Sequence, residues 1–168
     1  KHGFLTVKFN FPYMEARKKT PDKKDVLEAA YRKIVEEVKS SQYKPDRIFI
    51  GGKSMGGRIA SQVVAGGVDV NGLFFLGYPL HPPGRLDRLR DEHLYKITRP
   101  MLFVSGTRDS FGTRELLEKV LSRLGSKARV HWVEEGDHSF NTPEGKSAVP
   151  KTYETVVRVL VDWAQTSA

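Results

Sequence analysis

Short apolar runs of strand length alternate along this chain with amphipathic helical stripes, and this alternation most constrains its fold. The expected strands cover residues 4–9, 47–51, 73–76, 101–104 and 130–133. Such continuous apolar runs are typical of parallel strands that are buried on both faces. Because helical stripes separate them, the sequence predicts an α/β fold with a mostly parallel sheet between two layers of helices.

The first helix is expected from a four-residue apolar repeat over residues 26–38. Thr20 is expected as its N-cap, with Pro21 in the first turn. The helix is expected to end near Ser40. Further helical stripes cover residues 59–64, 116–124 and 153–164. Residues 78–100 contain four prolines and are expected to form mostly loop.

Length and composition exclude several classes of protein. The chain has 168 residues, 39% of them hydrophobic, so we expect a single domain with a buried core over residues 1–168. Cysteine is absent, which excludes a disulfide scaffold, a cysteine zinc site and a thiol nucleophile. The longest apolar run has strand length, far below the roughly 20 residues of a membrane span. No secretory signal is evident, and a cytoplasmic protein without membrane contact is expected.

The most specific motif is Gly52-Lys53-Ser54-Met55-Gly56, a G-x-S-x-G pattern that follows an expected strand and precedes an expected helix. In this context the turn strains the serine backbone and exposes its hydroxyl. Gly52 and Gly56 are expected there because a Cβ at either position would collide with the facing strand or helix. The Met55 N–H, at the helix start, is expected to bind a developing oxyanion. A bystander serine in a glycine-rich turn is the alternative interpretation.

A serine nucleophile needs a base and an orienting carboxylate. His138 follows the last expected strand, and Asp109 follows the strand before it. The carboxyl ends of parallel strands meet at one edge of the sheet, so Ser54, Asp109 and His138 are the candidate catalytic residues. An idle exposed histidine and a turn-forming aspartate are the alternatives. Asp137 is adjacent to His138 in sequence, so its side chain is expected to point elsewhere. Weaker candidates for the acid are Asp91 and Glu92.

Several stretches of the chain resemble the α/β-hydrolases. They are Phe9-Asn10-Phe11-Pro12-Tyr13, Gly51-Gly52-Lys53-Ser54-Met55-Gly56-Gly57-Arg58, Gly77-Tyr78-Pro79-Leu80-His81-Pro82-Pro83-Gly84, Leu89-Arg90-Asp91-Glu92 and Phe103-Val104-Ser105-Gly106-Thr107-Arg108-Asp109. More narrowly, the chain resembles the small dienelactone-hydrolase-like group. That group includes the testis-expressed hydrolase-like protein of vertebrates and the hydrolase-like subunit of a histone-acetyltransferase complex. The resemblance implies a three-layer α/β-hydrolase sandwich with a Ser-His-Asp triad, although some relatives serve as non-catalytic subunits.

One part of the family pattern has no counterpart in this sequence. The resemblance implies three further strands ahead of residues 4–9, the third ending in a His-Gly-rich loop that supplies a second oxyanion N–H. Residues 1–9 do not match that loop. We therefore expect a sheet that lacks the first three strands and hypothesise that the chain is N-terminally incomplete.

These observations predict a serine hydrolase, resembling a carboxylesterase, that cleaves an ester or thioester through an acyl-enzyme without a metal or cofactor. Residues 78–100 are too few for a large lid, which favours a small-molecule substrate. Phe11, Tyr78 and His81 follow strand ends and are expected substrate-binding walls, with ordinary loop packing as the alternative. Lys53 is expected either near an anionic substrate or as an exposed side chain.

Two other functions are alternatives to hydrolysis. An idle hydrolase fold that acts as a protein-interaction module is the main rival, since fold alone does not establish function. The formal charge of +8 raises the idea of nucleic-acid binding. Basic clusters at residues 17–19, 23–24 and 85–90 lack interleaved aromatic residues, so solvated surface is the preferred interpretation. The sequence gives no ligand spacing for a metal and leaves the oligomeric state open.

Overall fold

The computed structural model describes residues 3–145 and 147–167 and divides into two compact units, residues 1–46 and 47–168. The N-terminal unit contains a single helical turn, α1 (Pro12–Glu15), and the 17-residue helix α2 (Lys24–Ser40). Pro12 stands at the first position of α1, where its missing N–H costs nothing. In α2 the buried side chains are Leu27, Tyr31 and Val35, which share one face.

Two sequence predictions for the N-terminal unit are wrong. Residues 4–9 form no strand, and Leu5 and Val7 are more than half exposed. A strand needs a neighbour for its backbone hydrogen bonds, and the described part of this unit contains no other strand. The helix begins at Lys24 instead of after Thr20, because Lys23 is still extended, with ψ of 154°.

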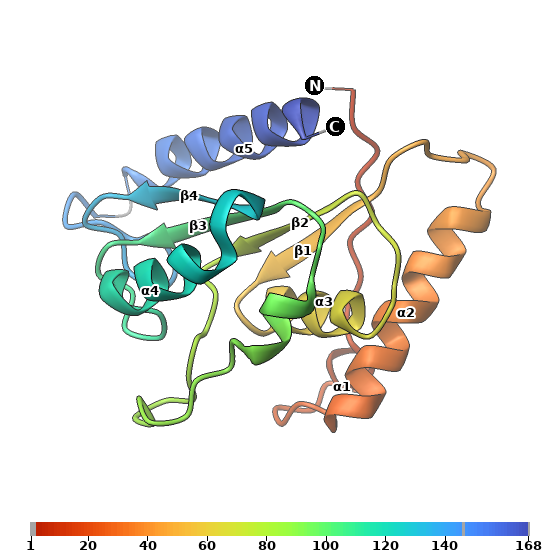
Figure 1. Cartoon of the computed structure of the whole chain (residues 1–168), viewed down its shortest axis with the longest axis horizontal. Coiled ribbons are helices and arrows are strands. Elements are labelled where there is room, and N and C mark those ends of the chain that lie inside the picture. The colour runs from red at the N-terminus through yellow and green to blue at the C-terminus, as the bar shows by residue number, and fades with distance from the viewer. Residues whose placement is uncertain (1–2, 146, 168) are drawn as a thin grey trace. The chain divides into compact units, whose positions relative to one another are not determined.

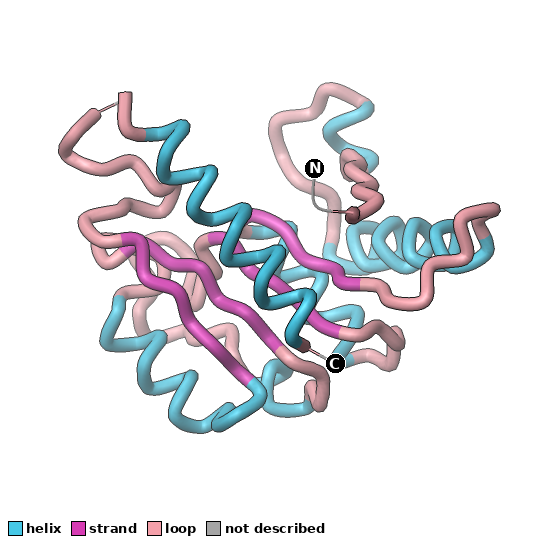
Figure 2. The backbone as a smooth tube through the Cα atoms, turned by 90° about the horizontal axis from the view of Figure 1, so that it is seen from above, coloured by secondary structure: helices cyan, strands magenta, loops and turns pink. Residues whose placement is uncertain are grey.

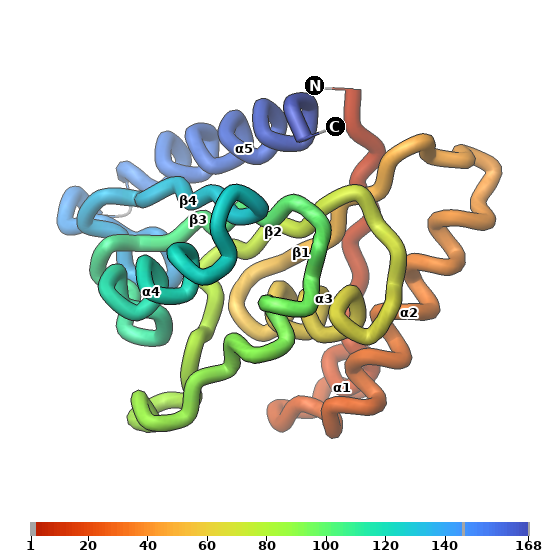
Figure 3. The backbone as a smooth tube through the Cα atoms, in the orientation of Figure 1, coloured from red at the N-terminus to blue at the C-terminus, as the bar shows by residue number. Residues whose placement is uncertain are grey.

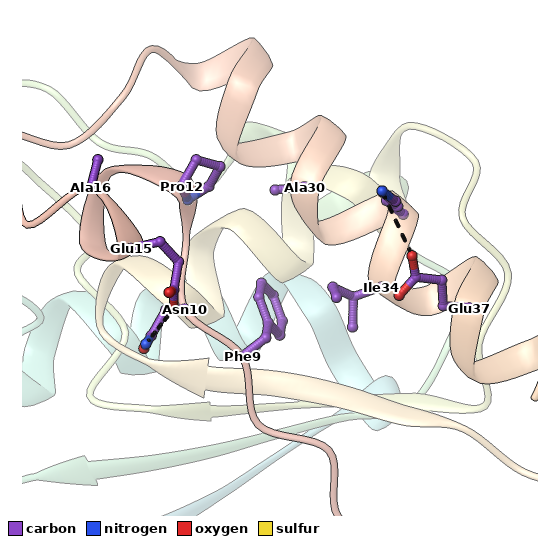
Figure 4. Close-up of a pocket in the computed structure, with 9 residues that line it drawn as sticks. Phe9, Asn10, Pro12, Glu15, Ala16, Ala30, Ile34 and Glu37 are labelled. Carbon is purple, nitrogen blue, oxygen red and sulfur yellow. Dashed lines mark hydrogen bonds and ion pairs between the residues drawn. The ribbon is translucent and has the colours of Figure 1, made fainter.

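A shallow hollow lies within the N-terminal unit, between residues 9–16 and α2. Its volume is about 560 Å³. Figure 4 shows Phe9 and Ile34 among its lining side chains, together with a hydrogen bond of 2.8 Å from Asn10 to Glu15. The Phe9 ring packs edge-on against Tyr31, with 5.1 Å between ring centroids. The hollow is lined by none of the candidate site residues.

The second unit is built on a four-stranded parallel sheet in the order β1-β2-β3-β4. The strands are β1 (Phe49–Lys53), β2 (Gly72–Leu76), β3 (Met101–Gly106) and β4 (Ala128–Val133). The connecting elements are α3 (Met55–Ala65), the 3₁₀ helix η1 (Glu92–Lys96), α4 (Arg114–Leu124), the short 3₁₀ turn η2 (Gly125–Lys127) and, after the sheet, α5 (Val149–Thr166). All four of these strands are confirmed, with ends shifted by up to two residues from the expected ones.

Helices cover both faces of this sheet, which gives three layers. Figure 1 shows α5 on one face and α3 and α4 on the other, and Figure 2 shows α5 lying over the strands. The α5 face holds a cluster of buried residues, namely Leu102, Val104, Val133, Phe140, Val156, Trp163 and Ala164. On the opposite face the rings of Phe75, Tyr78 and Phe103 pack together, with centroids 4.7–5.8 Å apart. The predicted α/β architecture is confirmed.

The segment between β2 and β3 is mostly loop, as its prolines predict. It leaves the sheet, turns, and comes back through η1 beside α3 (Figure 3). Because all strands run in one direction, the loops after β1, β3 and β4 start from the same edge of the sheet. No helix in the described ranges is long and apolar enough to cross a membrane.

Candidate active site

Ser54 occupies the single residue between β1 and α3, and its backbone is strained. Its φ of 51° and ψ of −118° lie outside the regions that side-chain-bearing residues normally adopt. The turn is held from both sides: the Ser54 N–H donates to the Leu76 carbonyl at 2.9 Å, and the Ser54 carbonyl accepts from the Arg58 N–H at 3.2 Å. This is the geometry of the sharp strand-to-helix turn that the G-x-S-x-G pattern predicts.

Close packing was expected at Gly52 and Gly56, but the tightest contact at this turn is at Gly57. A Cβ on Gly57 would lie 2.7 Å from the Gly52 carbonyl oxygen and 3.2 Å from the Phe75 ring. A Cβ on Gly56 would meet nothing within 4 Å, so the expected collision at Gly56 is wrong. A Cβ on Gly52 would touch the Gly56 and Gly57 backbone at 3.2–3.3 Å. The first turn of α3 presents Gly57, one residue further on, to the strand.

The structure brings Ser54, His138 and Asp109 together. His138 Nε2 lies 2.9 Å from Ser54 Oγ, and His138 Nδ1 lies 2.8 and 3.0 Å from the two Asp109 carboxylate oxygens. The Asp109 side chain is fully buried, whereas 19% of the His138 side chain is exposed. A carboxylate accepts a hydrogen bond from Nδ1–H. It thereby favours the tautomer in which Nε2 carries no proton and can accept the serine proton.

Hydrogen bonds to backbone N–H groups join the loop that carries Asp109 to the loop that carries His138. The Arg108 N–H donates to the Gly136 carbonyl at 2.9 Å, and the Glu135 N–H donates to Thr107 Oγ1 at 2.9 Å. The two backbone segments approach so closely at Gly106 that a Cβ there would lie 2.1 Å from the Gly136 carbonyl oxygen. These contacts fix the two loops against each other at the end of β3 and β4.

The Asp137 side chain points away from the imidazole, as expected, and hydrogen-bonds within the His138 loop. Its Oδ1 accepts from the N–H groups of Ser139 at 2.7 Å and Asn141 at 2.9 Å. The Asn141 side-chain amide also donates to the Asp137 carboxylate. This side-chain hydrogen bond is the main cause that lowers the pKa of Asp137 below its ordinary value. Asp91 is occupied elsewhere, since it accepts from the Tyr95 hydroxyl at 2.5 Å. The geometry therefore places Asp109 on His138.

Phe111 is a neighbour of the candidate site that the sequence analysis missed. Its ring lies against the His138 imidazole, with 4.6 Å between centroids and 50° between planes. Its N–H donates to Asp109 Oδ1 at 2.8 Å. The available signal was its place two residues after Asp109, in a loop at the carboxyl end of a strand. Phe111 thus supports both the carboxylate and the imidazole.

The three expected pocket-wall residues are interior or lie in the other unit. Tyr78 and His81 are each 2% exposed. The Tyr78 hydroxyl lies 3.1 Å from both Ser61 Oγ and His93 Nε2, and burial raises the pKa of Tyr78 well above its ordinary value. His81 Nδ1 lies 2.8 Å from the Pro82 oxygen. Phe11 belongs to the N-terminal unit, where it is buried.

The polar groups of the described residues form no metal-ligand cluster: three or more His, Asp or Glu side chains that could hold an ion do not converge. The Met55 N–H is at the first position of α3 and so has no acceptor within its own helix. Together the site holds a strained serine, an imidazole on its hydroxyl, a buried carboxylate on the imidazole and a free helix-terminal N–H. That set of groups is able to activate a hydroxyl for attack on a carbonyl.

A family model described as an alpha/beta hydrolase domain matches residues 1–165. The chain belongs to the α/β-hydrolase family. Among solved structures, this α/β-hydrolase chain is similar to a putative alpha/beta hydrolase from Agrobacterium tumefaciens, with a TM-score of 0.70, 14% identity and coverage of 97% of this chain and 70% of the other. Such identities show a shared fold.

Two further structures resemble this α/β-hydrolase. A monoacylglycerol lipase from Paleococcus ferrophilus has a TM-score of 0.66 and 16% identity, covering 90% of this chain and 79% of the lipase. An alpha-beta serine hydrolase homologue from Coxiella burnetii has a TM-score of 0.61 and 17% identity, covering 86% of this chain. The α/β-hydrolase chain spans only 61% of the Coxiella protein.

Proposed function

We propose that this α/β-hydrolase is a serine hydrolase that cleaves an ester or thioester of a small molecule through an acyl-enzyme. The observation that carries the proposal is the unbroken path from Ser54 Oγ to His138 Nε2 at 2.9 Å and from His138 Nδ1 to Asp109 at 2.8 Å. Names of similar structures, a serine hydrolase homologue and a monoacylglycerol lipase, agree with this chemistry. We place the chain, on its sequence motifs, in the dienelactone-hydrolase-like group.

The first half-reaction acylates the serine. His138 takes the Ser54 proton on Nε2 as Ser54 Oγ bonds to the substrate carbonyl carbon, and the carbonyl electrons move to oxygen. The Met55 N–H donates to that oxyanion. Collapse of the tetrahedral intermediate breaks the bond to the alcohol or thiol, which leaves with the proton from His138. Asp109 holds the imidazole tautomer and stabilises the imidazolium.

The second half-reaction returns the free enzyme. His138 takes a proton from water as the water oxygen attacks the acyl carbon. The second intermediate then collapses: the bond from the acyl carbon to Ser54 Oγ breaks, His138 returns its proton to Ser54 Oγ, and the carboxylic acid is released. The His138 side chain is 19% exposed, so the imidazole is partly in contact with solvent, the source of the attacking water. Each step uses groups that already lie within hydrogen-bond distance, so the cycle needs no rearrangement of the three residues.

Labelling with a fluorophosphonate probe tests this proposal. We expect the purified chain to form a covalent adduct at Ser54 and to hydrolyse p-nitrophenyl acetate. Ser54→Ala should abolish the adduct and lower kcat by at least about 10⁴-fold, because the nucleophile is lost. Ser139→Ala, which removes the hydroxyl of the half-buried residue next to His138, is the control and should keep the adduct. A correctly folded wild-type chain without any Ser54 adduct would favour the interaction-module alternative.

A further inference from the structure

Lys53 connects the two sides of the candidate site. It is the last residue of β1 and immediately precedes Ser54. Its Nζ donates a 2.7 Å hydrogen bond to the backbone carbonyl of His138, which is 85 residues further along the chain. From the sequence, Lys53 is expected either as an exposed side chain or as a contact for an anionic substrate. Lys53 is exposed, as one of these alternatives expects, and its ammonium group contacts the histidine loop.

The His138 carbonyl oxygen accepts its hydrogen bond from Lys53. In the ranges that the structure describes, no other hydrogen-bond donor reaches that oxygen. His138 lies in a loop between Glu135 and Phe140, both of which have positive φ, 54° and 64°. The bonds that Asp137 makes hold residues 139 and 141, so they do not restrain the His138 peptide directly.

A second contact places the Lys53 ammonium in the same loop. Its Nζ lies 5.3 Å from the centroid of the Phe140 ring, within the range of a cation–π interaction. Phe140 itself is 1% exposed and belongs to the core under α5. The ammonium is therefore placed between the His138 carbonyl and a ring that is fixed in the core. Burial lowers the pKa of Lys53, while the Asp109 and Asp137 carboxylates oppose that effect.

We propose that Lys53 is a positioning residue that ties the His138 loop to the strand end carrying Ser54 and so maintains the distance between Ser54 Oγ and His138 Nε2. This inference rests on the proposed function, because the distance matters for proton transfer between those two atoms. Lys53 touches neither atom, so its effect on the reaction is exerted through His138. A displacement of about 1 Å at such a pair is enough to slow a reaction by about 10²-fold.

The test compares Lys53→Met with Lys53→Arg and with Lys119→Met. Methionine keeps much of the stem but has no donor, whereas arginine keeps a cationic donor. Lys119 is an exposed lysine on α4 in the same unit and controls for loss of a positive charge. Each variant is labelled over a range of fluorophosphonate concentrations, which separates the limiting rate from the half-saturating concentration. Amide hydrogen exchange at residues 138–140 is measured on the same samples.

For Lys53→Met we expect the limiting labelling rate to fall at least tenfold, the half-saturating concentration to change less than twofold, and exchange at residues 138–140 to accelerate. Lys53→Arg should recover the rate to within about threefold, and Lys119→Met should match the wild type. Wild-type labelling rate and exchange in Lys53→Met would overturn the proposal. A change confined to the half-saturating concentration would also overturn it and assign Lys53 to substrate contact.

The exchange measurement keeps this proposal separate from the proposed function. If the wild type is not labelled at all, the hydrolase proposal fails, and with it the catalytic meaning of the tie. Faster exchange at residues 138–140 in Lys53→Met would still show that Lys53 orders the loop. If the wild type is labelled and exchange is unchanged in Lys53→Met, the hydrolase proposal stands and the positioning role fails.

Discussion

Single residues decide whether the candidate site is held in place. The nucleophile candidate, Ser54, is fixed by backbone hydrogen bonds on both sides, but His138 lies in a loop with no regular structure. Within the loop, the Phe140 N–H donates to the Asp137 carbonyl at 3.0 Å, and the Asp137 carboxylate accepts from the N–H groups of Ser139 and Asn141. Although Asp137 is adjacent to His138 in sequence, its carboxylate bonds the N–H groups of Ser139 and Asn141 and not the imidazole. These bonds stabilise the turn in which His138 lies.

Replacement of Asp137 tests that turn. Its carboxylate form is favoured in the folded chain, since hydrogen bonds from Asn141 lower the pKa of Asp137. The stabilisation is then complete above the ordinary aspartate pKa of about 3.9 and is lost as the pH falls below it. We expect Asp137→Ala to speed exchange of the Ser139 and Asn141 amides about three- to tenfold at neutral pH.

Two comparisons complete the Asp137 prediction. Wild-type protein should show the same acceleration, relative to other loop amides, only when the pH is below about 4. Asp162→Ala, at an exposed position on α5, should leave both amides unchanged. Equal exchange in Asp137→Ala and wild type at neutral pH would mean that the turn is held by its backbone alone.

At the scale of elements, the sequence predicted the sheet well and the N-terminal unit poorly. Strand residues 73–76 and 101–104 are apolar because they are buried on two faces, and that cause is visible in the sequence itself. Residues 4–9 carry similar propensity, yet the described structure gives them no partner strand. Partner availability is not encoded locally, which is why β propensity alone misassigned this segment.

The site shows the same division between local and non-local causes. The motif around Ser54 and the order Ser54, Asp109, His138 could be predicted, because strand ends at one edge of a parallel sheet converge. The buried positions of Tyr78 and His81 could not, since they depend on how the long segment between β2 and β3 turns back on α3. The hydrogen bond from Lys53 to the His138 carbonyl was missed because it joins residues 85 positions apart in the sequence.

The approach of α3 to β1 is tested by two adjacent glycines. Gly57→Ala should lower the free energy of unfolding by about 1–3 kcal/mol, because its Cβ would lie 2.7 Å from the Gly52 oxygen. Gly56→Ala should instead raise it by about 0.5–1 kcal/mol, since the Cβ meets nothing within 4 Å and alanine favours the helix. Urea denaturation of both variants measures the difference. Destabilisation of equal size at the two positions would contradict the assignment of the close contact to Gly57.

At the scale of the whole molecule, the two faces of the sheet in residues 47–168 have different tasks. The face under α3 carries the helix that follows Ser54 and the buried Tyr78 network. The face under α5 carries a core that contains no candidate catalytic residue but includes Phe140, which belongs to the His138 loop. The α5 face therefore meets the candidate site at Phe140, whose ring lies beside the Lys53 ammonium.

Trp163 provides the test of that division. It is 5% exposed, packs edge-on against Phe49 at 5.4 Å and lies over Gly72 on β2. We expect Trp163→Ala to lower the free energy of unfolding by about 3–5 kcal/mol, because a large buried ring is removed. Under conditions where the variant is still folded, the fluorophosphonate labelling rate should stay within about threefold of wild type, because the ring that packs on Trp163 is Phe49, whereas the Phe140 ring beside the Lys53 ammonium packs against Tyr153. Trp163→Phe should recover part of the lost stability. A tenfold loss of labelling in folded Trp163→Ala would instead mean that the α5 face controls the geometry of Ser54 and His138 as a whole.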